Sequence, residues 1–204
     1  PKEAIADMNA LLLSSVLGIV MMFSGLLLKQ KSNVRHLATF GLFLLFVVNI
    51  LEMYGITFFR INIAGMMHFD RFALLFNCII FFSTFIYFLL SARDIERTGS
   101  YYAEYFALIF FILCGIVLAS SFKSMLILFL GIEIISIPLY ILTGSDKKNL
   151  KSNEASLKYF LLGAFSTGLM LMGIALVYGS SGSFNTAEIN LYDKPGALMI
   201  AGMI

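Results

Sequence analysis

The sequence predicts an all-α, polytopic bundle of transmembrane helices, with six complete spans and the start of a seventh. Hydrophobic residues make up 60% of the chain and charged residues only 13%, and the mean hydropathy is +0.92. A soluble domain is about 45–50% apolar and about 25% charged. The apolar residues also gather into runs of roughly 20, the length that crosses the hydrocarbon core of a bilayer. We therefore expect an integral membrane protein in contact with lipid.

The spans follow from runs that carry almost no charge, at residues 8–28, 37–59, 72–92, 102–118, 125–143 and 155–178. Residues 102–143 are too long for one span, because a single helix of that length would extend about 60 Å. We expect a turn between Ser120 and Ser124 to divide it. Another apolar stretch begins after Pro195 and stops at Ile204, so we expect the chain to be a fragment of a longer protein.

Basic residues in the connections predict the orientation. The first, third and fifth connections carry eight: Lys29, Lys31, Arg35, Arg93, Arg97, Lys147, Lys148 and Lys151. The N-terminus and the other connections carry five: Lys2, Arg60, Arg71, Lys123 and Lys194. Positive residues are enriched on the cytoplasmic side of membrane proteins. The N-terminus is therefore expected on the outer side. With a net charge of +2 and no basic tail, nucleic acid is not expected as a partner.

Glu133 is the strongest candidate for function, because it is the only charged residue between Ser124 and Ser145. A charge at the bilayer centre costs at least about 2.5–3.5 kcal/mol, and carboxylates there usually mark an ion or proton path. Ser136 and Tyr140 follow at i+3 and i+7, on nearly the same helix face. Pro138 cannot donate a backbone hydrogen bond, so a carbonyl near the carboxylate could hold water. The alternative is a protonated, structural Glu133 that hydrogen-bonds a neighbouring helix.

Lys158 is the second candidate, early in the sixth span. It could face Glu133 across the bundle and exchange protons with it. The alternative is that Lys158 extends to the membrane surface, as lysines near helix ends commonly do.

Other polar residues in the spans carry weaker signals. Glu52 interrupts the second run at an uncertain depth, and Asn77 lies in the third, where such residues commonly hydrogen-bond between helices. Cys78 and Cys114 sit in apolar runs and are expected to be packing residues. No Gly-rich phosphate loop, haem or iron–sulfur pattern is present, so the chain itself is expected to hold no cofactor and no metal.

Two segments resemble a known family. Residues 131–140 (GIEIISIPLY) resemble the fifth-helix motif of subunit N of bacterial respiratory complex I. Residues 154–164 (EASLKYFLLGA) resemble the sixth-helix motif of the same family, and residues 173–179 (GIALVYG) also fit. The resemblance is specific over roughly residues 102–183 and covers the first three helices only in general pattern.

The resemblance implies an antiporter-like subunit, related to cation/proton antiporters. Members have about fourteen helices, with two inverted five-helix repeats after three leading helices. Residues 1–100 would then be the leading helices, and 101–204 the first part of a truncated repeat. Glu133 matches the glutamate of the family's proton path and Lys158 the sixth-helix lysine, and the lysine that pairs with the glutamate belongs to a later helix.

The function implied is proton translocation by a membrane subunit of a respiratory NADH:quinone oxidoreductase in a bacterial inner (plasma) membrane. FMN, iron–sulfur clusters and quinone would belong to partner subunits, and other membrane subunits of complex I would be its neighbours. Two alternatives stay open: a subunit of a stand-alone cation/proton antiporter, and a structural membrane scaffold with an inert Glu133. The transported ion could be H⁺ or Na⁺.

Overall fold

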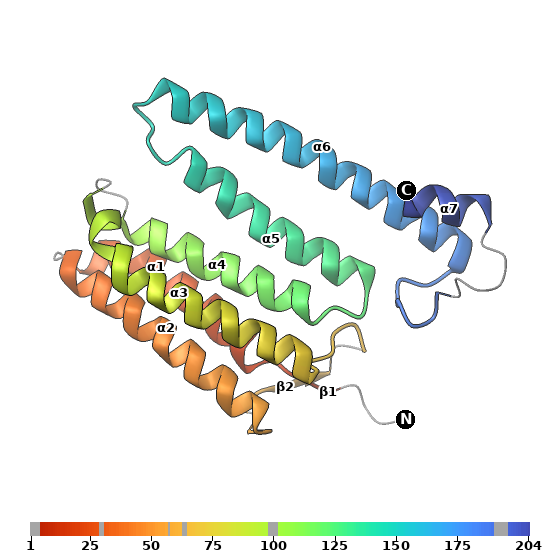
Figure 1. Cartoon of the computed structure of the whole chain (residues 1–204), viewed down its shortest axis with the longest axis horizontal. Helices are drawn as coiled ribbons and strands as arrows, with labels where there is room; N and C mark the ends of the chain where they lie inside the picture. The colour runs from red at the N-terminus through yellow and green to blue at the C-terminus, as the bar shows by residue number, and fades with distance from the viewer. Residues whose placement is uncertain (1–4, 29–30, 57, 63–64, 98–101, 190–195) are drawn as a thin grey trace.

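The computed structural model describes residues 5–28, 31–56, 58–62, 65–97, 102–189 and 196–204. Six long helices run side by side, and a short seventh packs on the end of the sixth (Figure 1). The helices are α1 Asn9–Leu27, α2 Lys31–Met53, α3 Arg71–Arg97, α4 Tyr102–Ser120, α5 Met125–Thr143, α6 Leu150–Ser181 and α7 Ala197–Met203. All of α1–α6 contain a segment long and apolar enough to cross a membrane, judged by length and composition. The predicted fold class is confirmed.

The helix ends are set by local backbone hydrogen bonds and glycine, and they do not always coincide with the ends of the apolar runs. The second run was expected to reach residue 59, but α2 ends at Met53. Gly55 has a φ of +79°, its N–H donates to the Glu52 carbonyl, and the Ile56 N–H donates to the Leu51 carbonyl. This pair of bonds is a Schellman motif, which terminates a helix at a left-handed glycine.

The predicted break between the fourth and fifth spans is confirmed. Helix α4 ends at Ser120 and α5 begins at Met125. The Ser124 side chain caps α5 by accepting a hydrogen bond from the Leu126 N–H at 3.3 Å. Helix α6 begins before its apolar run, where Asn149 accepts from the Lys151 N–H, and ends at Gly182, whose φ is +72°.

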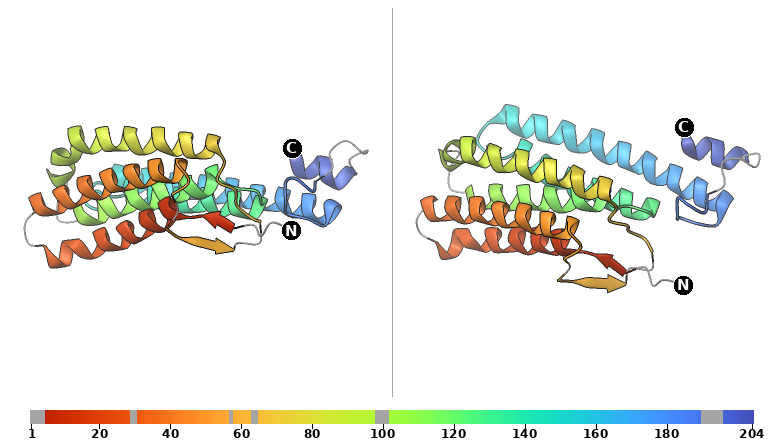
Figure 2. Two further views of the ribbon diagram at one scale, coloured as in Figure 1. Left: turned by 90° about the horizontal axis from the view of Figure 1, so that it is seen from below. Right: turned by 60° about the horizontal axis from the view of Figure 1, so that its bottom comes forward.

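A two-stranded antiparallel ribbon, which the sequence did not predict, joins the start of the chain to the α2–α3 connection. Strand β1 (Ile5–Asp7) pairs with β2 (Arg60–Asn62), with Ala6 opposite Ile61. The ribbon lies at the same end of the bundle as the α4–α5 turn and the end of α6 (Figures 1 and 2). Backbone bonds join these connections to one another: His68 to Ser121, Lys123 to Met66, Met125 to Phe184 and Thr186 to Lys123. We call this the stitched end of the bundle.

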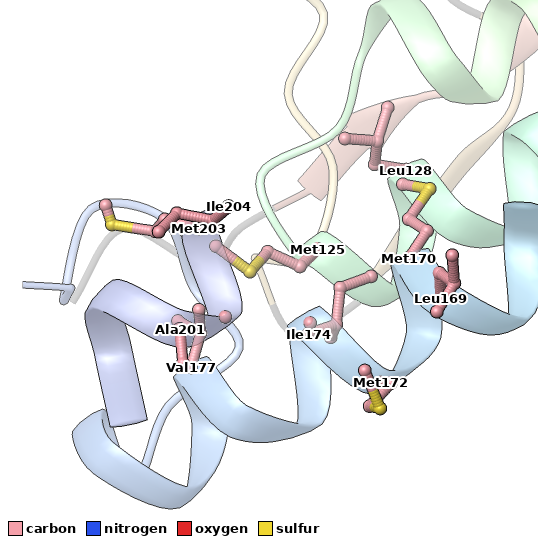
Figure 3. A pocket seen from close by; sticks show the side chains of 12 residues that line it. Met125, Leu128, Leu169, Met170, Met172, Ile174, Val177, Ala201, Met203 and Ile204 are labelled. Carbon is pink, nitrogen blue, oxygen red and sulfur yellow. The ribbon is translucent and has the colours of Figure 1, made fainter. Parts of the chain in front are cut away.

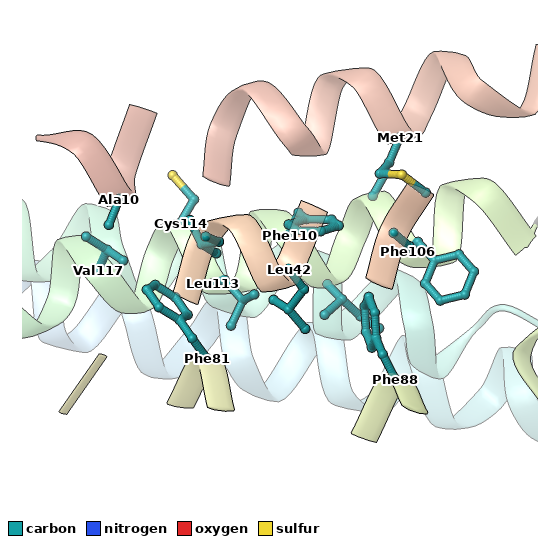
Figure 4. Packing of buried hydrophobic residues seen from close by; sticks show 14 of the residues in the cluster. Ala10, Met21, Leu42, Phe81, Phe88, Phe106, Phe110, Leu113, Cys114 and Val117 are labelled. Atoms are coloured by element: carbon teal, nitrogen blue, oxygen red, sulfur yellow. The ribbon is translucent and has the colours of Figure 1, made fainter. Parts of the chain in front are cut away.

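The apolar core lies among α1–α4 and includes four fully buried phenylalanines (Figure 4). Phe88 makes edge-on contacts with Phe106 at 5.1 Å and Phe110 at 6.2 Å between ring centroids, and Phe81 lies in the same cluster. Helix α4 also packs closely on α5, and α6 packs on α5 from the far side (Figure 1). Helix α5 is therefore the middle layer between the core and α6.

Most basic residues used to predict the orientation give no structural test. Lys2, Lys29 and Lys194 lie outside the described residues, as does Pro195 before the seventh span. The side chains of Lys31, Arg60, Arg93 and Arg97 are likewise outside them.

Candidate functional site

Glu133 lies near the middle of α5, about 12 Å along the helix from Met125 and about 15 Å from Thr143. Its side chain is partly buried. Within the described part of the chain, the carboxylate has no hydrogen bond or ion pair. The structure therefore places a carboxylate at mid-span with open hydrogen-bonding capacity.

Close packing on α4 fixes which way α5 turns Glu133. A Cβ added to Gly131 would lie 2.8 Å from the Ala119 backbone nitrogen, and one added to Gly115 would lie 2.9 Å from the Gly131 carbonyl oxygen. The two backbones thus approach at glycines. At about 100° per residue, Glu133 is about 160° around the helix from Gly131. The carboxylate is on the side of α5 that faces away from α4.

The other members of the predicted polar stripe make contacts of their own. The Ser136 hydroxyl donates to the Ile132 carbonyl of its own helix at 2.7 Å. Tyr140 is only 8% exposed, and its ring packs edge-on against Tyr159 and Phe160 of α6, at centroid distances of 4.9 and 5.8 Å. Both residues share the Glu133 side of α5, and Tyr140 anchors that side on α6.

Pro138 lies within α5 and is buried. It is about 140° around the helix from Glu133, near the side that packs on α4. Because proline has no N–H, the Ile134 carbonyl lacks its usual helical donor. The predicted gap in the backbone bonding is present, one residue from Glu133.

The structure does not bring Lys158 and Glu133 together. The Lys158 ammonium pairs with Glu154 one turn earlier on α6 at 2.5 Å, and the two side chains are 74% and 63% exposed. A Cβ on Gly163 would overlap the Tyr140 hydroxyl, which sets the level of α6 beside α5. Because the helices are antiparallel, Glu133, seven residues before Tyr140, lies level with residues near 170. Lys158 is about twelve residues, or about 18 Å, from that level.

Thr167 is a polar residue of α6 that the sequence analysis missed. It lies one turn beyond Gly163, on the partly buried face of α6 near the level of Glu133. Its hydroxyl donates to the Ala164 carbonyl at 3.3 Å. The sequence could have identified Thr167 only by its i+4 spacing from Gly163. Using that spacing requires knowing that Gly163 faces α5, which depends on the register of α6 on α5.

A cavity of about 650 Å³ opens between the start of α5, the second half of α6 and α7 (Figure 3). Its side chains are apolar, among them Met125, Leu128, Leu169, Met170 and Met203. Glu133 does not line it. This hollow offers no charged or hydrogen-bonding side chain to an ion.

Among the residues that the structure describes, no group of three or more His, Cys, Asp or Glu side chains is placed to hold a metal ion. Cys78 and Cys114 are free thiols on different helices, α3 and α4. The α5–α6 pair carries the protonatable side chains of Glu133, Tyr140 and Lys158.

Comparison with known proteins identifies relatives over most of the chain. Residues 121–204 match the family described as NADH:quinone oxidoreductase/Mrp antiporter, transmembrane. NADH-quinone oxidoreductase subunit N of Cytophaga hutchinsonii is 38% identical over 96% of this chain and 42% of the relative. The subunit N of Flavobacterium psychrophilum is 37% identical over 89% of the chain and 39% of the relative. The chain thus spans about two fifths of the length of these relatives.

Two solved structures share the fold. One is a membrane-bound sulfane sulfur reductase, an archaeal respiratory membrane complex, with a TM-score of 0.78 and 22% identity over 96% of this chain and 42% of that one. The other is respiratory complex I from Thermus thermophilus with bound aureothin, with a TM-score of 0.66 and 23% identity over 95% and 43%. The expected resemblance is confirmed: the chain is a multi-pass membrane protein, and its residues 121–204 match the NADH:quinone oxidoreductase/Mrp antiporter transmembrane family.

Proposed function

We propose that the chain is part of a proton-translocating membrane subunit of a respiratory NADH:quinone oxidoreductase, with Glu133 as the central proton carrier. The observation that carries this proposal is the position of Glu133, at mid-span and partly buried, within the residues that match the family. The relatives named as subunit N support the choice of complex.

Proton movement at Glu133 would depend on α5 as a fixed layer. The glycine contact with α4 holds one side of α5 rigidly, and the Glu133 side faces α6 with free acceptor oxygens. Moving one charge across the membrane takes about 2.3 kcal/mol per 100 mV, so outward transfer needs energy from a redox reaction. Electron transfer would occur in partner subunits that hold FMN, iron–sulfur clusters and quinone, with no redox centre in this chain.

Lys158 is proposed as a relay or modulator on the cytoplasmic side, about 18 Å from the level of Glu133. Its exposed pair with Glu154 near the start of α6 fits a residue that exchanges protons with an entrance. This role assumes the proposed orientation, with the N-terminus on the outer side of the bacterial inner membrane. We also propose residues 1–100 as leading helices and 101–204 as the beginning of the antiporter-like repeat.

A second candidate is a subunit of a stand-alone cation/proton antiporter. It is favoured by the family description, which covers Mrp antiporters as well as NADH:quinone oxidoreductases. Co-purification of the full-length protein with flavin and iron–sulfur subunits supports the first function, and its recovery in an NADH-independent Na⁺/H⁺ exchanger supports the second.

The deciding experiment is Glu133→Gln in the full-length protein, assembled with its partners and measured in sealed membrane vesicles. We expect assembly to persist while proton uptake per electron transferred falls severely. Glu104→Gln is the matched control, because Glu104 lies exposed in the first turn of α4. If Glu133→Gln pumps as well as Glu104→Gln does, Glu133 is inert and the scaffold alternative holds.

A further inference from the structure

Away from the α5–α6 pair, two completely buried asparagines link α2, α3 and α4 by side-chain hydrogen bonds. Asn49 of α2 is 0% exposed, and its side-chain nitrogen donates to the Leu74 carbonyl of α3 at 3.1 Å. Asn77 lies one turn after Leu74, is also 0% exposed, and its side-chain oxygen accepts from the Ser120 hydroxyl of α4 at 3.0 Å. Three helices therefore share one buried polar cluster.

Half of each amide is left without a partner. The Asn49 Oδ1 and the Asn77 Nδ2 are buried and make no hydrogen bond. An unsatisfied buried donor or acceptor costs about 1–3 kcal/mol, so native proteins usually satisfy such atoms, with ordered water where protein groups are absent. One orphan atom is an acceptor and the other a donor, and a water molecule is both.

A water molecule also fits if one of the side-chain amides is rotated by 180°. Asn49 is oriented by the Leu74 carbonyl, which only its nitrogen can satisfy. The Ser120 hydroxyl has one proton and lies 3.0 Å from Asn77 Oδ1 and 3.1 Å from the Val117 carbonyl. If the proton goes to Val117, Asn77 can turn and donate to Ser120, and its oxygen becomes the orphan atom. Water can serve either arrangement.

A buried carboxylate lies one turn from Asn49, near the end of α2. Glu52 follows Asn49 by three residues on the same face of α2 and is 4% exposed. Its Oε2 accepts from the Ala10 N–H of α1 at 3.2 Å. Polar surroundings lower the cost of burying a carboxylate, and water between the amides would extend those surroundings inward along α2.

We propose that α2, α3 and α4 enclose a buried water-binding site held by Asn49 and Asn77, next to Glu52 and separate from Glu133. The site would hydrate the interior of the bundle near the end of α4, where Ser120 is the last helical residue. It rests on the orphan amide atoms and is independent of the proposed proton translocation.

A cryo-electron microscopy map of the complete complex, at a resolution that shows ordered water, tests the site directly. We expect density at about 2.7–3.2 Å from Asn49 Oδ1 and from the Asn77 amide. A direct Asn49–Asn77 hydrogen bond, or a junction with no density, would overturn the proposal.

A double-mutant cycle gives a second readout from thermal unfolding of the purified complex. Asn77→Leu alone should displace the water and leave Asn49 unsatisfied, so the melting temperature should fall. Adding Asn49→Leu removes the second orphan, and the double variant should lose clearly less than the sum of the single losses. Ser14→Ala is the matched partner for additivity, because the buried Ser14 hydroxyl donates to the Leu11 carbonyl and its other contact is Cys114, not either asparagine. Additive losses from Asn49→Leu and Asn77→Leu would contradict a shared site, and if a variant fails to assemble, the wild-type map decides.

Discussion

The contact between α4 and α5 at Gly131 makes a quantitative prediction, because Gly131→Ala adds one methyl group where backbones meet. The new Cβ would lie 2.8 Å from the Ala119 nitrogen, 3.0 Å from its Cβ and 3.1 Å from its Cα. Two of these atoms are backbone, so relief requires the helices to separate. Overpacking of this kind costs about 1–3 kcal/mol. Alanine regains up to about 1 kcal/mol over glycine within a helix, which leaves a net loss of about 0–2 kcal/mol.

Gly168→Ala is the matched control, because a Cβ there meets nothing within 4 Å. Gly168 lies within α6, so this variant should keep the helix-propensity gain alone. The two variants should therefore differ by about 1–3 kcal/mol, measured as unfolding free energies of the purified protein in one detergent. Equal stabilities would refute the close approach of α4 and α5, and with it the argument that Gly131 turns Glu133 away from α4.

Two further predictions concern α6. Lys158→Ala should impair proton pumping more than Lys158→Arg does. Either change should alter the unfolding free energy by less than about 1 kcal/mol, because the pair with Glu154 is exposed. Equal pumping by the two variants would favour a lysine that only reaches the membrane surface. Gly182→Ala should lower the unfolding free energy by about 1–2 kcal/mol, since φ at Gly182 is +72°. Gly179→Ala should not, because Gly179 lies inside α6 and a Cβ there meets open space. Thermal melts that fail to separate the two variants would contradict the left-handed end of α6.

Sequence patterns predicted the fold well because apolar length alone dictates how many helices cross a membrane. They failed at the end of α2, where residues 54–59 are mostly apolar but Gly55 stops the helix. They also gave no sign of the β1–β2 ribbon, because three-residue strands are too short for a period-2 pattern to register.

For the candidate site, sequence placed Glu133 correctly at mid-helix, since position along a helix follows from residue number. It could not place Lys158 relative to Glu133, because that depends on the register of α6 on α5. The register is set by the Tyr140 ring against Gly163 and by the Ser156 hydroxyl, which donates to the Tyr140 carbonyl at 3.3 Å. The buried partners of Asn49 were hidden for the same reason.

The stitched end of the bundle gives any motion of α6 a preferred pivot. There the segment after α6 is tied by backbone bonds, from Met125 to Phe184 and from Thr186 to Lys123. At the opposite end the ties from α6 to α5 are the Ser152 and Ser156 hydroxyls, on the carbonyls of Thr143 and Tyr140. A tilt of α6 would thus pivot about its C-terminal end, and its displacement from α5 would be largest at the start of α6. Pairs of spin labels on α5 and α6 should report larger distance changes at the start of α6 than beside Phe184. Equal changes at both ends would mean that α6 slides as a whole.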